Sequence, residues 1–194
     1  MSRSNSERTR MTRQALIEAA RRLFIEKGYA ETATPDIVAA AGVTRGALYH
    51  HFEDKRAVFR AVAEQEAAAV SADIERQSMT ASTPRDALLS GARAYFDAMQ
   101  VEGRTRLLLL DAPAVLGAAE AAALDAREAE STLRAGLGDY LGGMAAEALL
   151  TPLTGLLSAA FDRAALAIEA GEDRAAYEAA IASVIDGLGG EVRR

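Results

Sequence analysis

The chain has 194 residues, of which 50% are hydrophobic, with no cysteine and a formal net charge of −6 at pH 7. This length is enough to bury one core or two small ones, and the absence of cysteine excludes disulfides and thiol chemistry. The longest apolar runs, such as LLLL at 107–110, are far too short to span a membrane, and the polar, basic start lacks a secretory signal. We therefore expect a cytoplasmic protein with no membrane partner.

Charge is divided unevenly along the chain. Residues 1–60 hold 11 Lys/Arg and 7 Asp/Glu, a net charge of +4, whereas residues 61–194 hold 11 basic and 21 acidic residues, a net charge of −10. A basic segment joined to an acidic body is typical of a nucleic-acid-binding end with a second domain attached. The same charge also fits an ordinary solvated surface, so it supports a binding motif without replacing one.

The first expected elements are a loose basic arm over residues 1–8 and a helix over residues 9–27. Apolar residues recur at helical spacing along this helix, and Gly28 would end it. The expected inward positions are Leu16, Ala19, Ala20, Leu23 and Phe24.

Residues 32–55, TATPDIVAAAGVTRGALYHHFEDK, predict two short helices around a tight turn. Thr34 followed by Pro35 is typical of a helix start, with Thr34 as the N-cap. Gly42 would end this helix in a left-handed conformation, and Thr44 would cap the next one. The expected inner face, at helical spacing on both sides of the turn, consists of Ile37, Val38, Ala41, Val43, Leu48 and Phe52.

The second of these helices carries its polar groups away from the apolar face. They are Arg45, Tyr49, His50 and His51, whose side chains can bond bases or phosphates. A short helix, a glycine turn and a capped helix with a polar outer face are typical of a helix-turn-helix DNA-binding motif. Glycine corners also occur in all-α proteins, so an interaction module that never touches DNA stays open as an alternative.

The segment from Phe24 to Val58 closely resembles the DNA-binding domain of the TetR (tetracycline-repressor) family. The resemblance covers roughly residues 10–65. It implies an N-terminal three-helix helix-turn-helix DNA-binding domain over residues 1–53 and a C-terminal helical effector-binding and dimerisation domain over residues 54–194. The matching positions are Phe24, Gly28, Tyr29, Thr32, Ile37, Ala41, Gly42, Val43, Thr44, Gly46, Leu48, Tyr49, His51, Phe52 and Lys55.

The resemblance also implies roles for individual residues. Arg45 and Gly46 would face base edges, and the fork of Arg45 suits guanine O6 and N7. Pro35 stands where some relatives carry a base-reading arginine. We therefore expect fewer base contacts from the first of the two short helices and a larger share from Arg45. Phosphate-touching positions in the family correspond to Thr34, Tyr49, His51 and Lys55. The full expected DNA-binding set is Thr34, Thr44, Arg45, Gly46, Tyr49, His50, His51 and Lys55.

The rest of the chain predicts further helices, and no alternating β-branched run suggests a strand, so the fold class is all-α. A fourth helix would run from about residue 54 to the late seventies. It would pack on the helix-turn-helix motif through Val58, Phe59 and Val62. Later helices are expected over 84–100, over a short stretch stopped by Pro113, over 118–141 as one long element, from a Thr151–Pro152 cap to Gly171, and over 173–188.

The last two helices carry broad apolar stripes with many small residues. In relatives of the TetR family, a C-terminal helical pair of this kind forms a two-fold, four-helix interface. Two reader helices about 34 Å apart would match successive major grooves. We therefore expect a homodimer on a palindromic DNA operator, with an interface of Leu153, Leu156, Leu157, Ala160, Ala164, Tyr177, Ile181, Val184, Ile185 and Leu188.

By resemblance, a small-molecule effector pocket would lie within about residues 79–165. The candidates are larger apolar or amphipathic residues among the many Ala and Leu, together with two charged residues that could orient a ligand. Each candidate is alternatively a core or surface residue. They are Tyr95, Phe96, Met99, Arg106, Leu108, Asp111, Tyr140 and Phe161.

Nothing in the sequence points to an enzyme, a cofactor or a metal. His50 and His51 are adjacent on a helix and point about 100° apart, whereas metal chelation uses neighbours three or four apart. The carboxylates of the outer helices have no identified partner and are assigned to a solvated face. We expect a DNA-binding transcriptional regulator, a repressor released from its operator by a small-molecule effector. The alternative is a regulator without a ligand, controlled by a protein partner.

Overall fold

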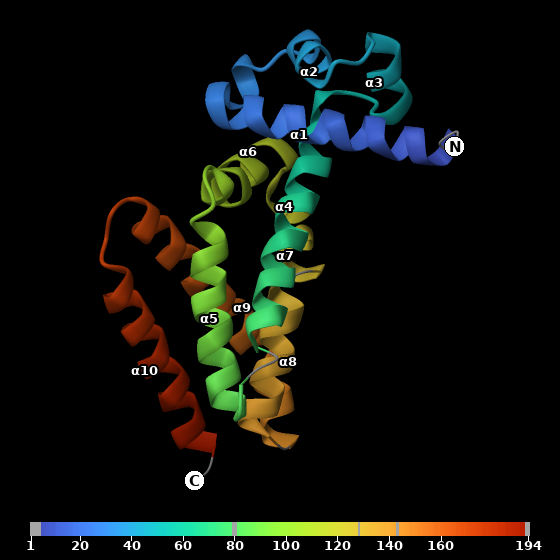
Figure 1. The fold of residues 1–194 in the computed structure, drawn as a ribbon. Coiled ribbons are helices and arrows are strands. Elements are labelled where there is room, and N and C mark those ends of the chain that lie inside the picture. The colour runs from blue at the N-terminus through green and yellow to red at the C-terminus, as the bar shows by residue number, and fades with distance from the viewer. Residues whose placement is uncertain (1–4, 79–80, 128, 143, 193–194) are drawn as a thin grey trace. The chain divides into compact units, whose positions relative to one another are not determined.

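The computed structural model describes residues 5–78, 81–127, 129–142 and 144–192, and every regular element in these ranges is a helix (Figure 1). The all-α prediction is confirmed. Across the same residues, no helix is both long and apolar enough to cross a bilayer. The elements are α1 (Asn5–Glu31), α2 (Thr34–Ala41), α3 (Arg45–His51), α4 (Lys55–Ser78), α5 (Pro84–Met99), the π-helix η1 (Arg106–Asp111), α6 (Ala112–Leu116), α7 (Ala118–Arg127), α8 (Ala129–Leu141), α9 (Met144–Glu169) and α10 (Arg174–Val192).

The chain forms two compact units. The first unit consists of residues 1–66 and 106–121, and the second unit of residues 67–105 and 122–194. Helix α4 contributes its N-terminal half to the first unit and its C-terminal half to the second. Each unit is therefore assembled from segments that are distant in the sequence.

The core of the first unit is formed by large apolar residues of α1 to α4. Phe24 and Phe59 are fully buried with their ring centroids 5.3 Å apart, and the ring of Tyr29 packs against both. Leu23 is half-buried, while the other predicted inward positions of α1 are buried. The remaining buried side chains of this core include Leu16, Ile17, Ile37, Leu48, Phe52, Val58 and Val62.

The start of α1 differs from the prediction. We expected a loose arm through residue 8, but the helix begins at Asn5, because no glycine or proline interrupts this stretch and Glu7 places an acidic side chain in the first turn. Residues 1–4 lie outside the described residues. Gly28, with φ 81° and ψ 164°, interrupts the helical backbone as expected, and a short helical stretch follows it to Glu31.

Residues 106–121 belong to the first unit because of polar contacts with α4. The guanidinium of Arg56 donates to the carbonyls of Val115 at 3.2 Å and Leu116 at 2.8 Å, and to the carboxylate of Glu120 at 2.8 Å. Arg60 also bonds Glu120, and this hydrogen bond lowers the pKa of that carboxyl group. These contacts anchor α6 and the start of α7 on the N-terminal half of α4.

The helix expected to stop at Pro113 continues past it. Pro113 is the second residue of α6, which continues directly from the π-helix η1, and Gly117, with φ 88°, ends the helix instead. The predicted helix over 118–141 is helical over 118–127 (α7) and 129–141 (α8), and residue 128 between them lies outside the described residues.

In the second unit, α8 packs against α5 and α9, and α10 packs against all three. Thr83 caps α5, and its hydroxyl accepts the N–H of Asp86 at 3.1 Å. The start of α9 is a correction, because the helix begins before the predicted Thr151–Pro152 cap and Pro152 lies inside it. The flanking Leu150 and Leu157 are buried, and their packing offsets the hydrogen bond that proline removes.

Candidate nucleic-acid interface and ligand pocket

The turn between α2 and α3 contains the left-handed glycine and the threonine cap that the sequence predicts. Gly42 has φ 66°, the left-handed conformation that glycine adopts at little cost, and its N–H closes α2 on the carbonyl of Ala39. Thr44 has extended backbone, and its hydroxyl accepts the N–H of Ala47 at 3.2 Å. Both interactions fix the start of α3, so the orientation of this helix follows from local sequence.

The predicted cap at the start of α2 is wrong by one residue. Ala33 occupies the N-cap position, because its carbonyl accepts the N–H groups of Asp36 and Ile37 at 3.0 and 3.3 Å. Thr34 is the first helical residue and Pro35 the second, so the hydroxyl of Thr34 does not cap the helix.

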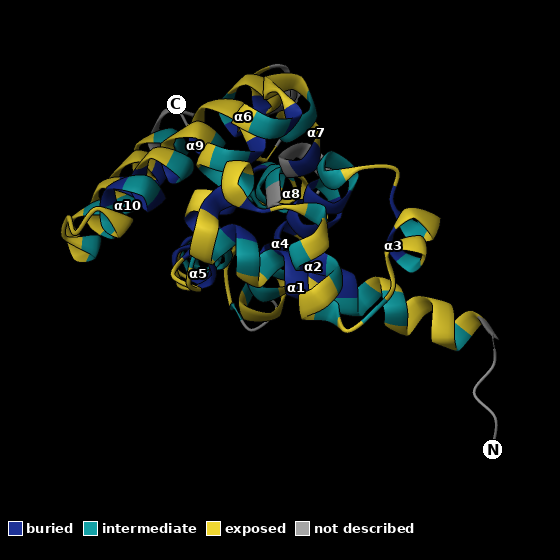
Figure 2. Cartoon of the chain, turned by 90° about the horizontal axis from the view of Figure 1, so that it is seen from above, coloured by how far each residue is buried: buried dark blue, intermediate teal, exposed yellow. Residues whose placement is uncertain are grey.

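A group of exposed residues at the start and outer side of α3, which we call the reader surface, consists of Thr44, Arg45, Gly46, Tyr49 and His50. The guanidinium carbon of Arg45 lies 5.5 Å from the ring centroid of Tyr49, which is itself 46% exposed. This cation–π contact, one helical turn apart, holds the two side chains on the same side of α3. Figure 2 shows exposed and half-buried residues along α3 and the N-terminal part of α1.

Gly46 does not owe its identity to packing within the chain. Its φ is not positive, and the nearest atom to an added Cβ would be the hydroxyl oxygen of Thr44, at 4.0 Å. A side chain would therefore fit in the free protein. The bare backbone at this exposed position leaves room for a partner to approach closely.

His51 lies at the end of α3 and is half-buried, with its ring 5.2 Å from that of His50. Burial lowers the pKa of His51, and the charges of His50 and Arg13 lower it further. The guanidinium of Arg13, on α1, lies 5.2 Å from the ring centroid of Phe52. Arg13 thus adds a cation beside α3 that no local pattern marks, since only the packing of α1 against α3 brings it there.

Lys55 is occupied by the protein's own backbone. Its ammonium donates to the carbonyls of Tyr29 at 2.7 Å, Ala30 at 3.3 Å and Thr32 at 2.9 Å, and lies 4.3 Å from the Tyr29 ring centroid. These carbonyls end α1, where helical partners run out. An ammonium has three hydrogens, so a phosphate contact of the kind implied by resemblance would compete with three bonds already made.

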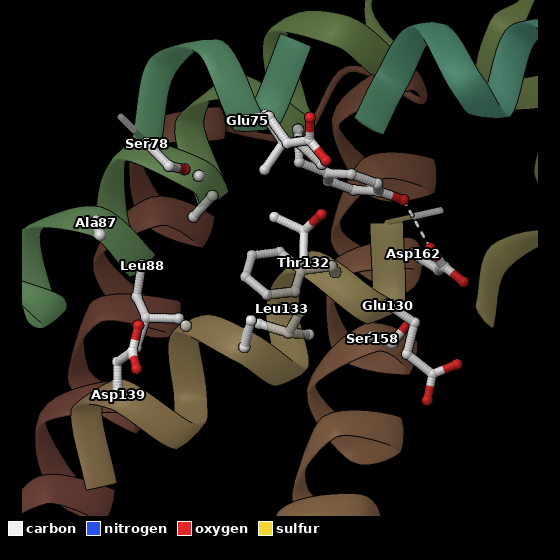
Figure 3. A pocket seen from close by; sticks show the side chains of 17 residues that line it. Glu75, Ser78, Ala87, Leu88, Glu130, Thr132, Leu133, Asp139, Ser158 and Asp162 are labelled. Carbon is white, nitrogen blue, oxygen red and sulfur yellow. Dashed lines mark hydrogen bonds between the residues drawn. The ribbon is translucent and has the colours of Figure 1, made fainter. Parts of the chain in front are cut away.

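The second unit contains a pocket of about 460 Å³ lined by residues of α4, α5, α8 and α9 (Figure 3). Two of the predicted residues, Tyr95 and Phe161, line it, with ring centroids 5.7 Å apart in an edge-to-face arrangement. The hydroxyl of Tyr95 donates to the carboxylate of Asp162 at 2.6 Å, the bond that is drawn dashed in Figure 3.

The other candidates lie outside this pocket. Phe96 and Met99 line a smaller cavity of about 170 Å³ in the same unit. Tyr140 is absent from the lining of both cavities, and its ring lies against the backbone of Gly189 on α10. Arg106, Leu108 and Asp111 belong to η1 in the first unit, where Arg106 and Asp111 form an ion pair at 3.4 Å. Helical spacing identified apolar positions but not which neighbour each one faces.

The described lining of the larger pocket includes four carboxylates: two are exposed, as a solvated face predicts (Glu75 and Asp139), and two are half-buried (Glu130 and Asp162). Glu75 lies on α4, Glu130 and Asp139 on α8, and Asp162 on α9. They are spread over three helices, so no local spacing connects them. Within the described part of the chain, no group of three His, Cys, Asp or Glu is placed to hold a metal ion.

The residues expected at a dimer interface divide into three groups. Leu156 is 70% exposed, Val184 is 51% exposed and Ala160 is exposed. Half-buried positions are Leu153, Tyr177 and Leu188. The others pack inside the second unit: Leu157, Ala164, Ile181 and Ile185.

Comparison with known proteins matches both units. The family model described as bacterial regulatory proteins of the tetR family matches residues 16–62, and the model described as a tetracyclin repressor-like C-terminal domain matches residues 85–190. A crystal structure of a TetR-family transcriptional regulator from Pectobacterium atrosepticum is 30% identical, with a TM-score of 0.70. The match covers 96% of this chain and 95% of that one.

Curated relatives match over shorter stretches. The HTH-type transcriptional regulator AcrR of Shigella flexneri is 34% identical over 110 residues, and the HTH-type transcriptional repressor AcnR of Corynebacterium diphtheriae is 35% identical over 108 residues. Each match covers 56% of this chain, and 51% and 55% of the two relatives. The chain therefore spans about half the length of the curated relatives it matches.

Proposed function

This chain belongs to the TetR family of bacterial transcriptional regulators, and from this premise we propose that it is a ligand-responsive repressor. Its dimer binds a palindromic DNA operator through α3 and leaves it when a small molecule enters the pocket of the second unit. Residues 1–53 bind DNA, and residues 54–194 bind the effector and form the dimer. The observation that carries DNA binding is the exposed reader surface on a helix whose start is fixed by Gly42 and Thr44.

In this proposal the residues of α3 divide by chemistry. Arg45 reads a guanine edge, and Gly46 lets the backbone approach the bases. Phosphates are held by polar side chains that position the domain without reading sequence: Arg13, Thr34, Thr44, Tyr49, His50 and His51. Lys55 supports the interface indirectly, because its hydrogen bonds to the carbonyls of Tyr29 and Thr32 hold the segment that precedes α2.

DNA binding is tested with the region upstream of the gene that encodes this chain. The protein should bind this fragment in a fluorescence anisotropy titration, with an affinity that falls steeply as salt increases. A matched fragment of scrambled sequence should bind more weakly and should not respond to Arg45→Ala. Equal affinity for both fragments would contradict the proposal and favour an interaction module that does not read DNA.

Dimerisation would use the exposed apolar strip on α9 and α10. Leu156, Ala160 and Val184 lie on this strip, and the exposed residues beside them are small: Gly155, Ala159, Ala180 and Gly187. Small residues permit close approach of a second helical pair. Leu156→Glu should give monomers in sedimentation velocity, whereas Leu110→Glu, at an exposed leucine of the first unit, should remain dimeric.

The pocket favours a small-molecule effector over control by a protein partner alone. At about 460 Å³ it is within the size range of ligand sites, and its walls are mostly apolar with a few polar groups. A metabolite and drug library should therefore contain compounds that raise the melting temperature of the protein. A library without any such compound would leave partner control as the better account.

Release of DNA requires that the effector favour a conformation in which the two readers no longer fit the groove spacing. The route we propose is α4, whose residues belong to both units, together with residues 106–121, bonded to α4 through Arg56. A coupling of about 1–3 kcal/mol would change operator affinity about 5–150-fold, and operator would weaken effector binding by the same factor. Spin labels at position 45 across the dimer should report a changed separation; unchanged separation alongside full release would exclude this route.

A further inference from the structure

We propose that the effector pocket takes a hydrophobic organic cation, such as an aromatic amine or a quaternary ammonium compound. This inference rests on the proposed function, because it assigns a chemical class to the ligand of the same pocket. Two features of the lining carry it: apolar and aromatic walls, and charged groups that, among the described lining residues, are all acidic.

The apolar part of the lining comes from all four helices. Ile74 of α4, Leu88 of α5, Leu133 of α8 and Phe161 of α9 contribute large side chains to it. Burying the apolar body of a ligand against such walls is favourable in proportion to the area removed from water. A bare inorganic ion gains nothing from these walls, which favours an organic ligand.

The charged residues that the structure describes in the lining are all acidic. The described lining residues include Glu75, Glu130, Asp139 and Asp162, and no Lys, Arg or His is among them. Figure 3 shows Glu75 on one side of the space, Asp139 near Leu88, and Glu130 and Asp162 on another side. The carboxylates therefore surround the apolar space instead of clustering at one point.

Aromatic rings add to the attraction for a cation. Tyr95 and Phe161 form an edge-to-face pair in the wall, and a cation over the face of such a ring is stabilised by its quadrupole. The hydrogen bond from Tyr95 to Asp162 holds an acceptor carboxylate next to these rings. A positively charged head would thus meet rings and a carboxylate at the same wall.

The alternatives fit less well. An anion would enter a partly apolar space beside four carboxylates, two of them half-buried, with no Lys, Arg or His among the described lining residues, and like charges repel there. A neutral ligand would gain the apolar contact but would not use the carboxylates. The distribution of charge in the lining therefore distinguishes the three classes.

The test uses three planar ligands of similar ring size and different charge. They are 10-methylacridinium, a permanent cation; acridine, which is neutral at pH 8; and anthracene-9-carboxylate, an anion. Each is titrated against the full-length protein without DNA, followed by ligand fluorescence and by the melting temperature of the protein. We expect saturable binding of the cation, roughly tenfold or more tighter than acridine, the equivalent of about 1.4 kcal/mol, and no saturable binding of the anion.

Two variants locate the effect. The double variant Glu75→Gln/Glu130→Gln keeps the shape of both side chains and should weaken 10-methylacridinium roughly tenfold while leaving acridine unchanged. Asp73→Asn is the matched control, because it removes a carboxylate from the same helix, α4, at a position that does not line the pocket. The control should bind all three ligands like the parent protein.

The inference would be overturned by equal affinity for cation and acridine, by tighter binding of the anion, or by a cation affinity that the double variant does not change. Absence of saturable binding by all three ligands would also overturn it. Failure of the proposed function has a different readout, because it would appear as loss of operator recognition or as no release of operator by any compound. The two failures are therefore distinguishable.

Discussion

The reader surface and the pocket differ in charge, in exposure and in the way their residues come together. The reader surface presents Arg45 and Tyr49 to solvent from a single helix of seven residues. The pocket is lined by apolar side chains and carboxylates from four helices, contributed by residues between 74 and 162, and two of the carboxylates, Glu75 and Asp139, are exposed. The first displays the guanidinium of Arg45 beside an aromatic ring, and the second has acidic groups around an apolar space.

This difference teaches how each site responds to substitution. The reader surface lies on a well-packed core, so a change at its exposed side chains removes a contact and leaves the fold intact. Substitutions should destabilise the fold in the core beneath this surface and in the segment before α2 that Lys55 holds. In the pocket the same side chains form the walls and select the ligand. Five predictions, from the largest expected effect to the smallest, test how cleanly these roles separate.

The largest effect is expected in the core beneath the reader. Phe24→Ala removes a fully buried ring that packs on Phe59 and Tyr29, and should lower the free energy of unfolding by about 3–5 kcal/mol. Urea denaturation followed by circular dichroism measures this. Arg22→Ala, at an exposed position of the same helix, should change stability by less than about 0.5 kcal/mol. Similar losses in both variants would contradict the assigned core.

The next effect concerns the segment between α1 and α2, whose carbonyls bond Lys55. Lys55→Ala leaves the carbonyls of Tyr29 and Thr32 without their charged donor and should cost about 2 kcal/mol of stability. Lys27→Ala, which removes an exposed ion pair with Asp36, should cost less than about 1 kcal/mol. The salt dependence of DNA binding should stay near that of the parent protein. A slope reduced by about one unit would instead assign Lys55 a phosphate contact.

Arg45→Ala tests the role of the reader surface directly. Losing a bidentate contact to guanine should weaken operator binding by about 1–3 kcal/mol and relax specificity at one base pair, with little change in stability. Arg76→Ala removes an equal charge from the second unit and should leave sequence preference unchanged. Competition anisotropy with single-base operator variants distinguishes the two. An unchanged sequence preference in Arg45→Ala would show that Arg45 does not read the operator bases.

Two glycines of the motif should respond in opposite ways. Gly42→Ala places a Cβ at φ 66° with no atom within 4 Å, so backbone strain alone should cost about 1–2 kcal/mol of stability. Gly46→Ala has helical backbone and space for a Cβ, and should stabilise the fold by about 0.5–1 kcal/mol while weakening DNA binding. Thermal unfolding and operator titration of both variants check this. Equal operator affinity of Gly46→Ala and the parent would show that no partner approaches there.

The smallest effect is a pH dependence of DNA binding. The lowered pKa of His51 keeps this imidazole neutral near pH 7 in the free protein, so a phosphate beside it would favour proton uptake on binding. Operator affinity should therefore rise as pH falls from about 8 to 6, by less than about tenfold per pH unit. Fold stability should change in the opposite direction, being lost as pH falls below the unfolded pKa of about 6.5. His51→Asn should reduce both dependences, and a pH profile unchanged in this variant would contradict the assignment.

Much of the first unit is predictable because its signals are local. The left-handed Gly42, the Thr44 cap and the apolar spacing of α1 to α4 involve residues a few positions apart, where backbone sterics and helix periodicity decide the outcome. The same is true of the Thr83 cap of α5. The exceptions are small: α1 begins earlier than expected, and Ala33 caps α2 in place of Thr34.

The remaining features depend on contacts between residues distant in the sequence. Lys55 bonds carbonyls more than twenty positions away, and residues 106–121 join the first unit through Arg56. The apolar stripes of α9 and α10 were evident, but only packing decides that Ile185 is buried and Leu156 exposed. The pocket carboxylates converge from three helices. Periodicity determines which face of a helix is apolar, whereas the neighbour that covers this face is chosen by the packing of the whole unit.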